Sequence, residues 1–388
     1  MKFFSRQIEA SVHEAVRAFP AIVMTGPRRT GKTTVLRSLF PKTRYILLED
    51  PDIQKRIQAD PRGFLDDLKP PILFDEIQNV PELFDYIRTL IDQSPRKMGQ
   101  WLFTGSQEAP LMRGVSESMA GRAAILQLLP LSLAETDRVN LFLGGYPEVI
   151  ARPSAHNLRF SSYLQTYLER DVRAIANIRD LGVFRRFLAF LAARHGQLLN
   201  RSDLAASLGV SVPTISEWLQ ILDVTGQIML VSPYFENYGK RLMKTPKVYI
   251  GDSGLACHLL GIQSKDELAR SPFLGSLFEG FVAGEILKSQ INHGRRKELY
   301  YFRDHQGLEV DFLFPGKNGA LHLVECKASK TVHPGMAAPM NSLFKSMPNP
   351  SSIKRTVVHM ASKTGPETRA IFPGVEALNI NRFVQSIN

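Results

Sequence analysis

The segment with the clearest chemical potential is GPRRTGKT, which occupies residues 26–33 and has the spacing G-x-x-x-x-G-K-[ST] of a phosphate-binding loop. Its glycines allow the backbone to wrap closely around a phosphate chain, with the N–H groups pointing inward. We expect Lys32 to reach the β- and γ-phosphates and the Thr33 hydroxyl to bind Mg²⁺. The motif therefore predicts a nucleotide site lined by Gly26, Pro27, Arg28, Arg29, Thr30, Gly31, Lys32, Thr33 and Thr34.

Two acidic residues end the apolar run ILFDE at residues 72–76. At the end of a buried strand, Asp75 is expected to bind the same Mg²⁺. Glu76 would then orient and deprotonate an attacking water as a general base. A strand that ends in two acids is often only the start of a solvated loop, but the phosphate-binding loop before it favours the catalytic interpretation.

Two further residues are candidates for contact with a γ-phosphate. The segment WLFTGSQ at residues 101–107 ends in small polar residues, and we assign the sensor role to Ser106, with Thr104 as its substitute. Arg122 stands just before the last apolar run and could act as an arginine finger on the nucleotide of its own subunit or of a neighbour. The alternatives are a plain strand-ending turn and a surface arginine.

The elements that must position these residues are short apolar runs separated by helix-like stretches. Such an alternation predicts a parallel sheet covered by helices on both faces. The phosphate-binding loop directly follows the first run and precedes a predicted helix at residues 33–40, which is the context that the motif requires. The five runs lie at residues 21–25, 45–48, 71–74, 101–104 and 123–128.

A series of motifs in chain order carries a family resemblance: GPRRTGKT, ILFDEIQNVPELF, LFTGS, AGR, LPLS, GGYPEV and YLERDV. Together they resemble the prokaryotic AAA-like ATPases that carry a C-terminal domain of unknown function, over essentially the whole chain. The resemblance implies that the nucleotide is ATP and that residues 1–135 form an AAA-like P-loop domain. It also implies the possibility of a homo-oligomeric ring in which Arg122 acts in trans.

The middle of the chain is predicted to contain a helical lid or linker at residues 136–198 and a winged helix at residues 199–252. Helix-like segments at 201–208 and 212–222 flank a glycine turn, which is the helix-turn-helix arrangement. The second helix presents no arginine or lysine, so we expect backbone contact with DNA through the wing instead of base recognition. Protein docking is the alternative. The expected DNA-contacting cations of the wing are Lys240, Arg241, Lys244 and Lys247.

The last third, residues 253–388, contains a possible metal site. Glu279 lies on a predicted helix, Asp311 on a predicted strand, and Glu325 and Lys327 on the next strand. Residues i and i+2 of a strand share a face, so Glu325 and Lys327 point the same way and Asp311 can meet them across the hairpin. Carboxylate oxygens suit Mg²⁺, and the metal and lysine could activate water for phosphodiester cleavage.

This Asp, Glu-x-Lys pattern is similar to the PD-(D/E)XK nuclease fold. The proline of the family motif is absent, because Val310 stands before Asp311. The resemblance implies a nuclease-like α/β domain in which Glu279, Asp311 and Glu325 bind metal and Lys327 is catalytic. The alternative is an ion-pair cluster in a degenerate domain that only binds.

Composition agrees with a multidomain protein. The chain has 388 residues, of which 44% are hydrophobic and 22% charged, and this excludes a disordered or fibrous protein. Two cysteines exclude a cysteine-rich zinc site or a disulfide framework. No long uncharged apolar run and no signal peptide are evident, so we expect a cytoplasmic protein without membrane partners. The net charge of +11 suits a nucleic-acid partner.

The sequence thus predicts an α/β multidomain chain with a P-loop parallel sheet, a helical lid plus winged helix, and a nuclease-like α/β domain. Two hypotheses follow for its function. In the first, ATP binding or hydrolysis controls a metal-dependent nuclease acting on DNA. In the second, the chain is an ATP-dependent switch that binds DNA or protein, and the nuclease-like domain is inactive.

Overall fold

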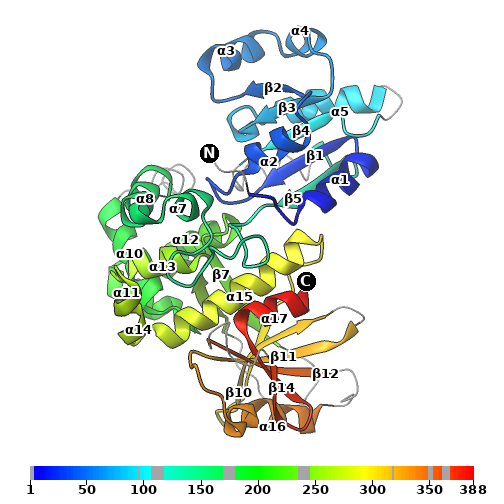
Figure 1. The fold of residues 1–388 in the computed structure, drawn as a ribbon. Coiled ribbons are helices and arrows are strands. Elements are labelled where there is room, and N and C mark those ends of the chain that lie inside the picture. Colours follow the sequence, from blue (N-terminus) through cyan, green and yellow to red (C-terminus); the bar gives the residue numbers. More distant parts are fainter. Residues whose placement is uncertain are drawn as a thin grey trace.

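Figure 1 shows the computed structural model of the chain. The structure describes residues 4–93, 97–105, 118–168, 180–234, 245–316, 319–347, 353–360 and 368–388. A parallel sheet with its helices lies at one end of the molecule, a second and larger sheet lies at the other end, and most of the remaining helices gather beside them.

The first sheet contains five parallel strands in the order β2-β3-β4-β1-β5. This confirms the predicted parallel sheet, and it places β4 between the strand before the phosphate-binding loop and the strand that carries the two acids. The central strands are buried throughout, which explains their unbroken apolar runs. The strands are β1 (Ala21–Thr25), β2 (Arg44–Leu47), β3 (Ile72–Asp75), β4 (Trp101–Thr104) and β5 (Ala123–Gln127).

Helices cover both faces of this sheet. One face packs against α1 and α2 through a core that includes Ile22, Met24 and Leu36, and the other packs against α3, α4 and α5 around Phe74 and Phe103. Alternate residues of β1 therefore enter different cores, as the period of a strand requires. The helices are α1 (Glu9–Ala18), α2 (Lys32–Leu39), α3 (Pro51–Ala59), α4 (Pro61–Asp66) and α5 (Leu83–Gln93).

The middle region is helical. In the expected helical lid, α8 is followed by a π-helical turn at Leu164–Leu168, and residues 169–179 lie outside the described ranges. Asn200 and Ser211 cap α11 and α12, and Gly209 ends α11 at a φ of 69°, so the predicted helix-turn-helix is present as local structure. The helices are α7 (Pro147–Ala151), α8 (His156–Tyr163), α10 (Leu181–Ala193), α11 (Arg201–Leu208) and α12 (Val212–Val224).

The second sheet joins the expected wing to the C-terminal strands. Its order is β13-β14-β12-β11-β10-β9-β7-β8-β6, and the junction is a parallel pairing of β7 with β9 at Ser232 and Pro233. The strands are β6 (Gln197–Leu198), β7 (Ile228–Pro233), β8 (Lys247–Ile250), β9 (Tyr300–Arg303), β10 (Glu309–Pro315), β11 (Leu321–Lys327), β12 (Ile353–His359), β13 (Thr368–Phe372) and β14 (Val375–Asn379).

A domain boundary was expected between residues 252 and 253, but the second sheet and its hydrophobic core both contain residues from each side of this position. One hydrophobic core runs from Leu131 through the helix-turn-helix to Ile387, and a smaller one lies under α16. Helices α15 and α17 cover one face of the C-terminal strands, and α16 covers the other. The C-terminal helices are α13 (Ser253–Leu259), α14 (Lys265–Arg270), α15 (Leu274–Asn292), α16 (Ala338–Ser346) and α17 (Ile380–Ile387).

Helix α15 is the longest of the described helices with 19 residues, and it runs from beside α14 to the base of the first domain (Figure 1). It is buried along most of its length because neighbours surround it on all sides. In the described parts of the chain, we find no helix whose length and apolar character would allow it to span a membrane.

Candidate active site

The phosphate-binding loop connects β1 to α2 and owes its shape to two glycines. Gly26 has a φ of 134°, and a Cβ there would lie 2.2 Å from the carbonyl oxygen of Leu128. Gly31 has a φ of 98° and stands directly before the first residue of α2. Any other residue at Gly26 would force the loop away from β5, so the tight turn needs glycine.

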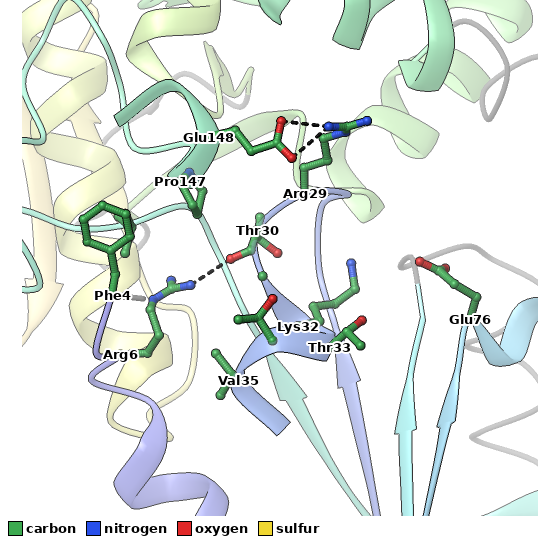
Figure 2. Close-up of a pocket in the computed structure, with 13 residues that line it drawn as sticks. Phe4, Arg6, Arg29, Thr30, Lys32, Thr33, Val35, Glu76, Pro147 and Glu148 are labelled. Atoms are coloured by element: carbon green, nitrogen blue, oxygen red, sulfur yellow. Dashed lines mark hydrogen bonds and ion pairs between the residues drawn. The ribbon is translucent and has the colours of Figure 1, made fainter. Parts of the chain in front are cut away.

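Lys32 and Thr33 begin α2, where the helix N-terminus favours negative ligands. Lys32 is buried, and its Nζ donates to the carbonyl oxygens of Gly26 and Pro27 at 3.0 Å each. The ammonium group is therefore held inside the loop that would surround the phosphates. Figure 2 shows Lys32 and Thr33 facing the open space beside Glu76.

Asp75 meets Thr33 across the site. The Thr33 hydroxyl donates to Asp75 Oδ1 at 2.7 Å, and the Tyr45 hydroxyl donates to Asp75 Oδ2 at 2.8 Å. Thr104 at the end of β4 also donates to Asp75 Oδ1. Burial together with the bond to Asp75 raises the pKa of Tyr45. The hydroxyl and carboxylate oxygens that the sequence predicted as Mg²⁺ ligands thus lie in direct contact, and this oxygen donor set fits a hard divalent cation.

Glu76 adopts a left-handed backbone conformation with a φ of 58°, which is uncommon for a residue with a side chain. Its N–H donates to Thr104 Oγ1 at 3.3 Å, and Gln78 Nε2 donates to Glu76 Oε2 at 2.5 Å. Strained positions of this kind concentrate at active sites. Here the turn directs the carboxylate of Glu76 to the edge of the cavity that Lys32 and Thr33 also line.

The cavity has a volume of about 280 Å³, and it includes a contribution from the helical region that the sequence analysis did not identify. Glu148 at the start of α7 forms an ion pair with Arg29 of the loop, with a shortest distance of 2.7 Å, and another with Arg159 at 2.6 Å. Glu148 belongs to the motif GGYPEV, which in the sequence supports only the family resemblance. The sequence signal for this contact is the acidic residue directly after Pro147, in the first turn of α7.

Arg6 is a second residue that the sequence analysis missed. Its guanidinium is almost fully buried and donates to the carbonyl oxygen of Thr30 at 2.9 Å and to that of Leu129 at 2.6 Å. It also forms an ion pair with Glu135 at 2.9 Å. Arg6 thereby fixes the back of the phosphate-binding loop to the segment that follows β5.

The prediction that Arg122 contacts the nucleotide of its own subunit is wrong. Ala21 pairs with Ala123 at the starts of β1 and β5, whereas the phosphate-binding loop follows the other end of β1. At about 3.3 Å per residue, the strand alone separates Arg122 from the loop by roughly 13 Å. Arg122 instead forms a two-pronged ion pair with Asp92, at 2.7 and 2.8 Å. Ser106 lies outside the described residues, so only its substitute Thr104 is placed in the site.

The C-terminal carboxylates form a second group of acidic side chains, of which Glu325 is buried and Glu279 and Asp311 are partly buried. Asp311 on β10 accepts from the N–H of Cys326 at 2.7 Å, and Lys327 Nζ donates to Glu325 Oε1 at 2.7 Å. Glu279 on α15 accepts from the Tyr249 hydroxyl at 2.5 Å and from Lys247 Nζ at 2.8 Å. We call Glu279, Asp311 and Glu325 the carboxylate cluster.

The three carboxylates influence one another. Burial raises the pKa of Asp311 well above its usual value, and repulsion from the negative charges of Glu279 and Glu325 raises it further. Burial also raises the pKa of Glu325. However, no three His, Cys, Asp or Glu side chains in the described part of the chain are arranged to hold a metal ion. The predicted metal shell of Glu279, Asp311 and Glu325 is therefore not assembled, and Lys247 stands against Glu279.

The prediction that Lys247 contacts DNA is wrong. Its side chain is only 3% exposed because β8 lies inside the second sheet, and its Nζ forms ion pairs with Glu279 and with Glu309 at 2.6 Å. Burial alone would lower the pKa of Lys247, but Glu279, Asp311 and Glu309 together raise it. The other three wing cations, Lys240, Arg241 and Lys244, lie outside the described residues.

Comparisons with known proteins assign three segments of the chain. Residues 18–136 match the family described as AAA domain, and residues 138–266 and 274–381 match two different domains of unknown function, DUF8612 and DUF4143. Rv2008c of Mycobacterium tuberculosis is 33% identical over 346 residues, which cover 87% of this chain and 76% of that protein. The chain belongs to the Rv2008c family of AAA-domain proteins.

This AAA-domain protein has another relative in the same family, Mb2031c of Mycobacterium bovis, with the same 33% identity and coverage. Among solved structures, it is similar to the Walker-type ATPase PABY2304 of Pyrococcus abyssi, with a TM-score of 0.44 and 16% identity over 66% of this chain and 96% of that chain. Because that TM-score is low, the assignment of the P-loop ATPase domain rests on the AAA match and the loop geometry.

Proposed function

We propose that this AAA-domain protein binds and hydrolyses ATP with Mg²⁺ in the cavity between α2 and α7. The observation that carries the proposal is the contact of 2.7 Å between Thr33 Oγ1 and Asp75 Oδ1, with Lys32 and Glu76 on either side of it. A hydroxyl and a carboxylate at this place are what the triphosphate-bound Mg²⁺ needs in P-loop enzymes.

Each group of the chain has a distinct task in this proposal. Backbone N–H groups of the loop bind the phosphates, and Lys32 donates to the β- and γ-phosphates. Bound Mg²⁺ would neutralise charge on the phosphate oxygens. Glu76 accepts a proton from water, the water oxygen bonds to the γ-phosphorus, and the bond from that phosphorus to the bridging oxygen breaks. The products are ADP and inorganic phosphate.

Two substitutions test this assignment. Glu76→Gln should leave ATP binding intact and reduce hydrolysis at least about 100-fold, because it removes the proton acceptor. Lys32→Ala should remove nucleotide binding or turnover. ATP affinity is measured with a fluorescent analogue and hydrolysis by phosphate release. Equal hydrolysis rates in the wild type and Glu76→Gln would contradict the assignment of Glu76.

We further propose that the protein acts in the cytoplasm and that DNA is its partner. Support comes from the net charge of +11 and from the helix-turn-helix of α11 and α12. Contact would be made with the DNA backbone through Lys240, Arg241 and Lys244. In a binding assay, log affinity should fall linearly with log salt concentration, and replacing these three cations should reduce the slope. An unchanged slope would contradict a role for them.

Two roles remain for the C-terminal domain. The first is a metal-dependent nuclease that the nucleotide state controls, and the second is a binding switch without cleavage. The position of Lys247 against Glu279 favours the switch. DNA should therefore stay intact when it is incubated with the protein in Mg²⁺ or Mn²⁺, with and without ATP. Cleavage that Asp311→Ala abolishes would instead establish the nuclease.

A homo-oligomer is also part of the proposal, with Arg122 acting on the nucleotide of a neighbouring subunit. Arg122→Ala and Glu76→Gln would each be inactive alone but would complement each other in a mixture, because some interfaces then combine both native residues. Full activity of Arg122→Ala alone would contradict this role.

A further inference from the structure

Lys247, a residue of the middle region, contacts the C-terminal carboxylate cluster through Glu279. The Nζ atom of Lys247 lies 2.8 Å from Glu279 Oε1 and 2.6 Å from Glu309 Oε1, and its side chain is 3% exposed. The same ammonium lies 5.5 Å from the centre of the Tyr301 ring. Lys247 is therefore a fixed internal cation.

The sheet holds this lysine in place. Lys247 begins β8, where it is paired on one side with Leu198 of β6 and on the other with Val231 of β7. Tyr249 follows two residues later on the same face of β8 and donates to the same oxygen of Glu279 at 2.5 Å. Two residues of one strand thus donate to the same oxygen of Glu279.

While Lys247 holds Glu279, the cluster also contains a buried carboxylate oxygen that has no donor among the residues described. Glu325 is buried, and although its Oε1 accepts from Lys327, none of the described groups donates to its Oε2. Asp311 is close enough to Glu279 and Glu325 to interact with both. A buried carboxylate oxygen without a donor is costly unless something positive satisfies it.

We propose that Lys247 occupies the position of a divalent cation in the carboxylate cluster and excludes one by holding Glu279. An ammonium group has three donors and one positive charge, so it uses the same oxygen lone pairs that a hard metal ion would use. Replacement of Lys247 by an uncharged residue of similar length should then turn the cluster into a divalent-cation site. This inference concerns a different site from the proposed ATP hydrolysis and does not depend on it.

The test uses full-length protein without nucleotide and Mn²⁺ as the probe, since Mn²⁺ favours carboxylate oxygens and its free form is counted directly by electron paramagnetic resonance. Wild type and Asp311→Asn should bind the same amount of Mn²⁺. Lys247→Met should bind one additional Mn²⁺ per chain, and the double variant Lys247→Met with Asp311→Asn should lose it. Lys247→Arg is the matched control that keeps the charge, and it should resemble the wild type.

Two results would overturn the proposal. One is Mn²⁺ binding by the wild type that Asp311→Asn removes, because Lys247 would then not exclude a cation. The other is a folded Lys247→Met protein that gains no Mn²⁺. Circular dichroism verifies folding, and Lys247→Gln replaces the methionine variant if that one does not fold. The comparison of wild type with Asp311→Asn needs no change at Lys247, so it tests the proposal in every case.

Discussion

At the scale of single residues, Arg29 joins the phosphate-binding loop to α7. This arginine belongs to the phosphate-binding loop, yet its guanidinium is paired with Glu148 of α7 at 2.7 and 2.8 Å. A triphosphate in the cavity would offer oxygens of the same charge as Glu148. The ion pair therefore links the state of the loop to the position of α7, and it also places a negative charge near the phosphates.

We predict that Glu148→Gln tightens ATP binding by about two- to fivefold, which corresponds to the 0.5–1 kcal/mol typical of a partly exposed ion pair. The reason is that a negative charge close to the phosphates is removed. Titration with a fluorescent ATP analogue measures the affinity. Glu49→Gln is the matched control, because Glu49 pairs with the neighbouring Arg28 at a longer distance of 3.8 Å. Weaker binding by Glu148→Gln would mean that Glu148 positions Arg29 for the nucleotide.

At the scale of elements, His195 joins three parts of the second sheet region. It follows α10, its Nδ1 accepts from the N–H of Ile250 at 3.0 Å, and its ring lies against Gly280 of α15, where a Cβ would come within 2.1 Å of Nε2. Burial lowers the pKa of His195 from the usual 6.5 to about 3. The folded protein thus keeps this ring neutral over a range in which the unfolded chain protonates it.

The consequence is a loss of stability in acid. Above pH 6.5 the ring is neutral in both states and has no linked effect, whereas between pH 6.5 and 3 only the unfolded state binds the proton. We predict that the unfolding free energy falls by about 1.4 kcal/mol per pH unit from this residue below pH 6.5. Urea unfolding at pH 7 and pH 5 measures it, and His195→Asn should lose less over that interval. Equal losses would show that other groups cause the acid sensitivity.

The sequence predicts elements well where one motif or one buried strand determines them. The loop and the strand ending in Asp75 were predicted because parallel strands buried on both faces appear as continuous apolar runs. The role of Lys247 was not predictable in this way, because it depends on the pairing of β7 with β9, whose residues are 68 apart at Ser232 and Tyr300. A lysine among other basic residues favours a surface position when only the sequence is considered, whereas contacts with residues distant in the chain bury Lys247.

At the scale of the whole molecule, α15 connects the two halves. At its end near the first domain, Glu285 Oε2 accepts from the N–H of Leu133 at 2.8 Å, and Lys288 Nζ donates to the carbonyl oxygen of Leu131 at 2.9 Å. Leu131 also lines the nucleotide cavity. Towards its other end, the same helix supplies Glu279 to the carboxylate cluster. One continuous helix therefore contacts both the segment beside the ATP site and the C-terminal cluster.

Glu285 and Lys288 also pair with each other at 2.9 Å, and both residues are buried. The helix and the segment 131–133 are therefore joined by buried charged groups.

We predict that Lys288→Met lowers the unfolding free energy by about 3–5 kcal/mol, because it leaves the Glu285 carboxylate buried without its cation. Adding Glu285→Gln should recover part of this loss, since the remaining amide is uncharged. Urea unfolding of the two single variants and the double variant gives the coupling between the two residues. If the double variant loses the sum of the two single losses, the pair is not coupled, and the attachment of α15 to the first domain depends on its apolar contacts instead.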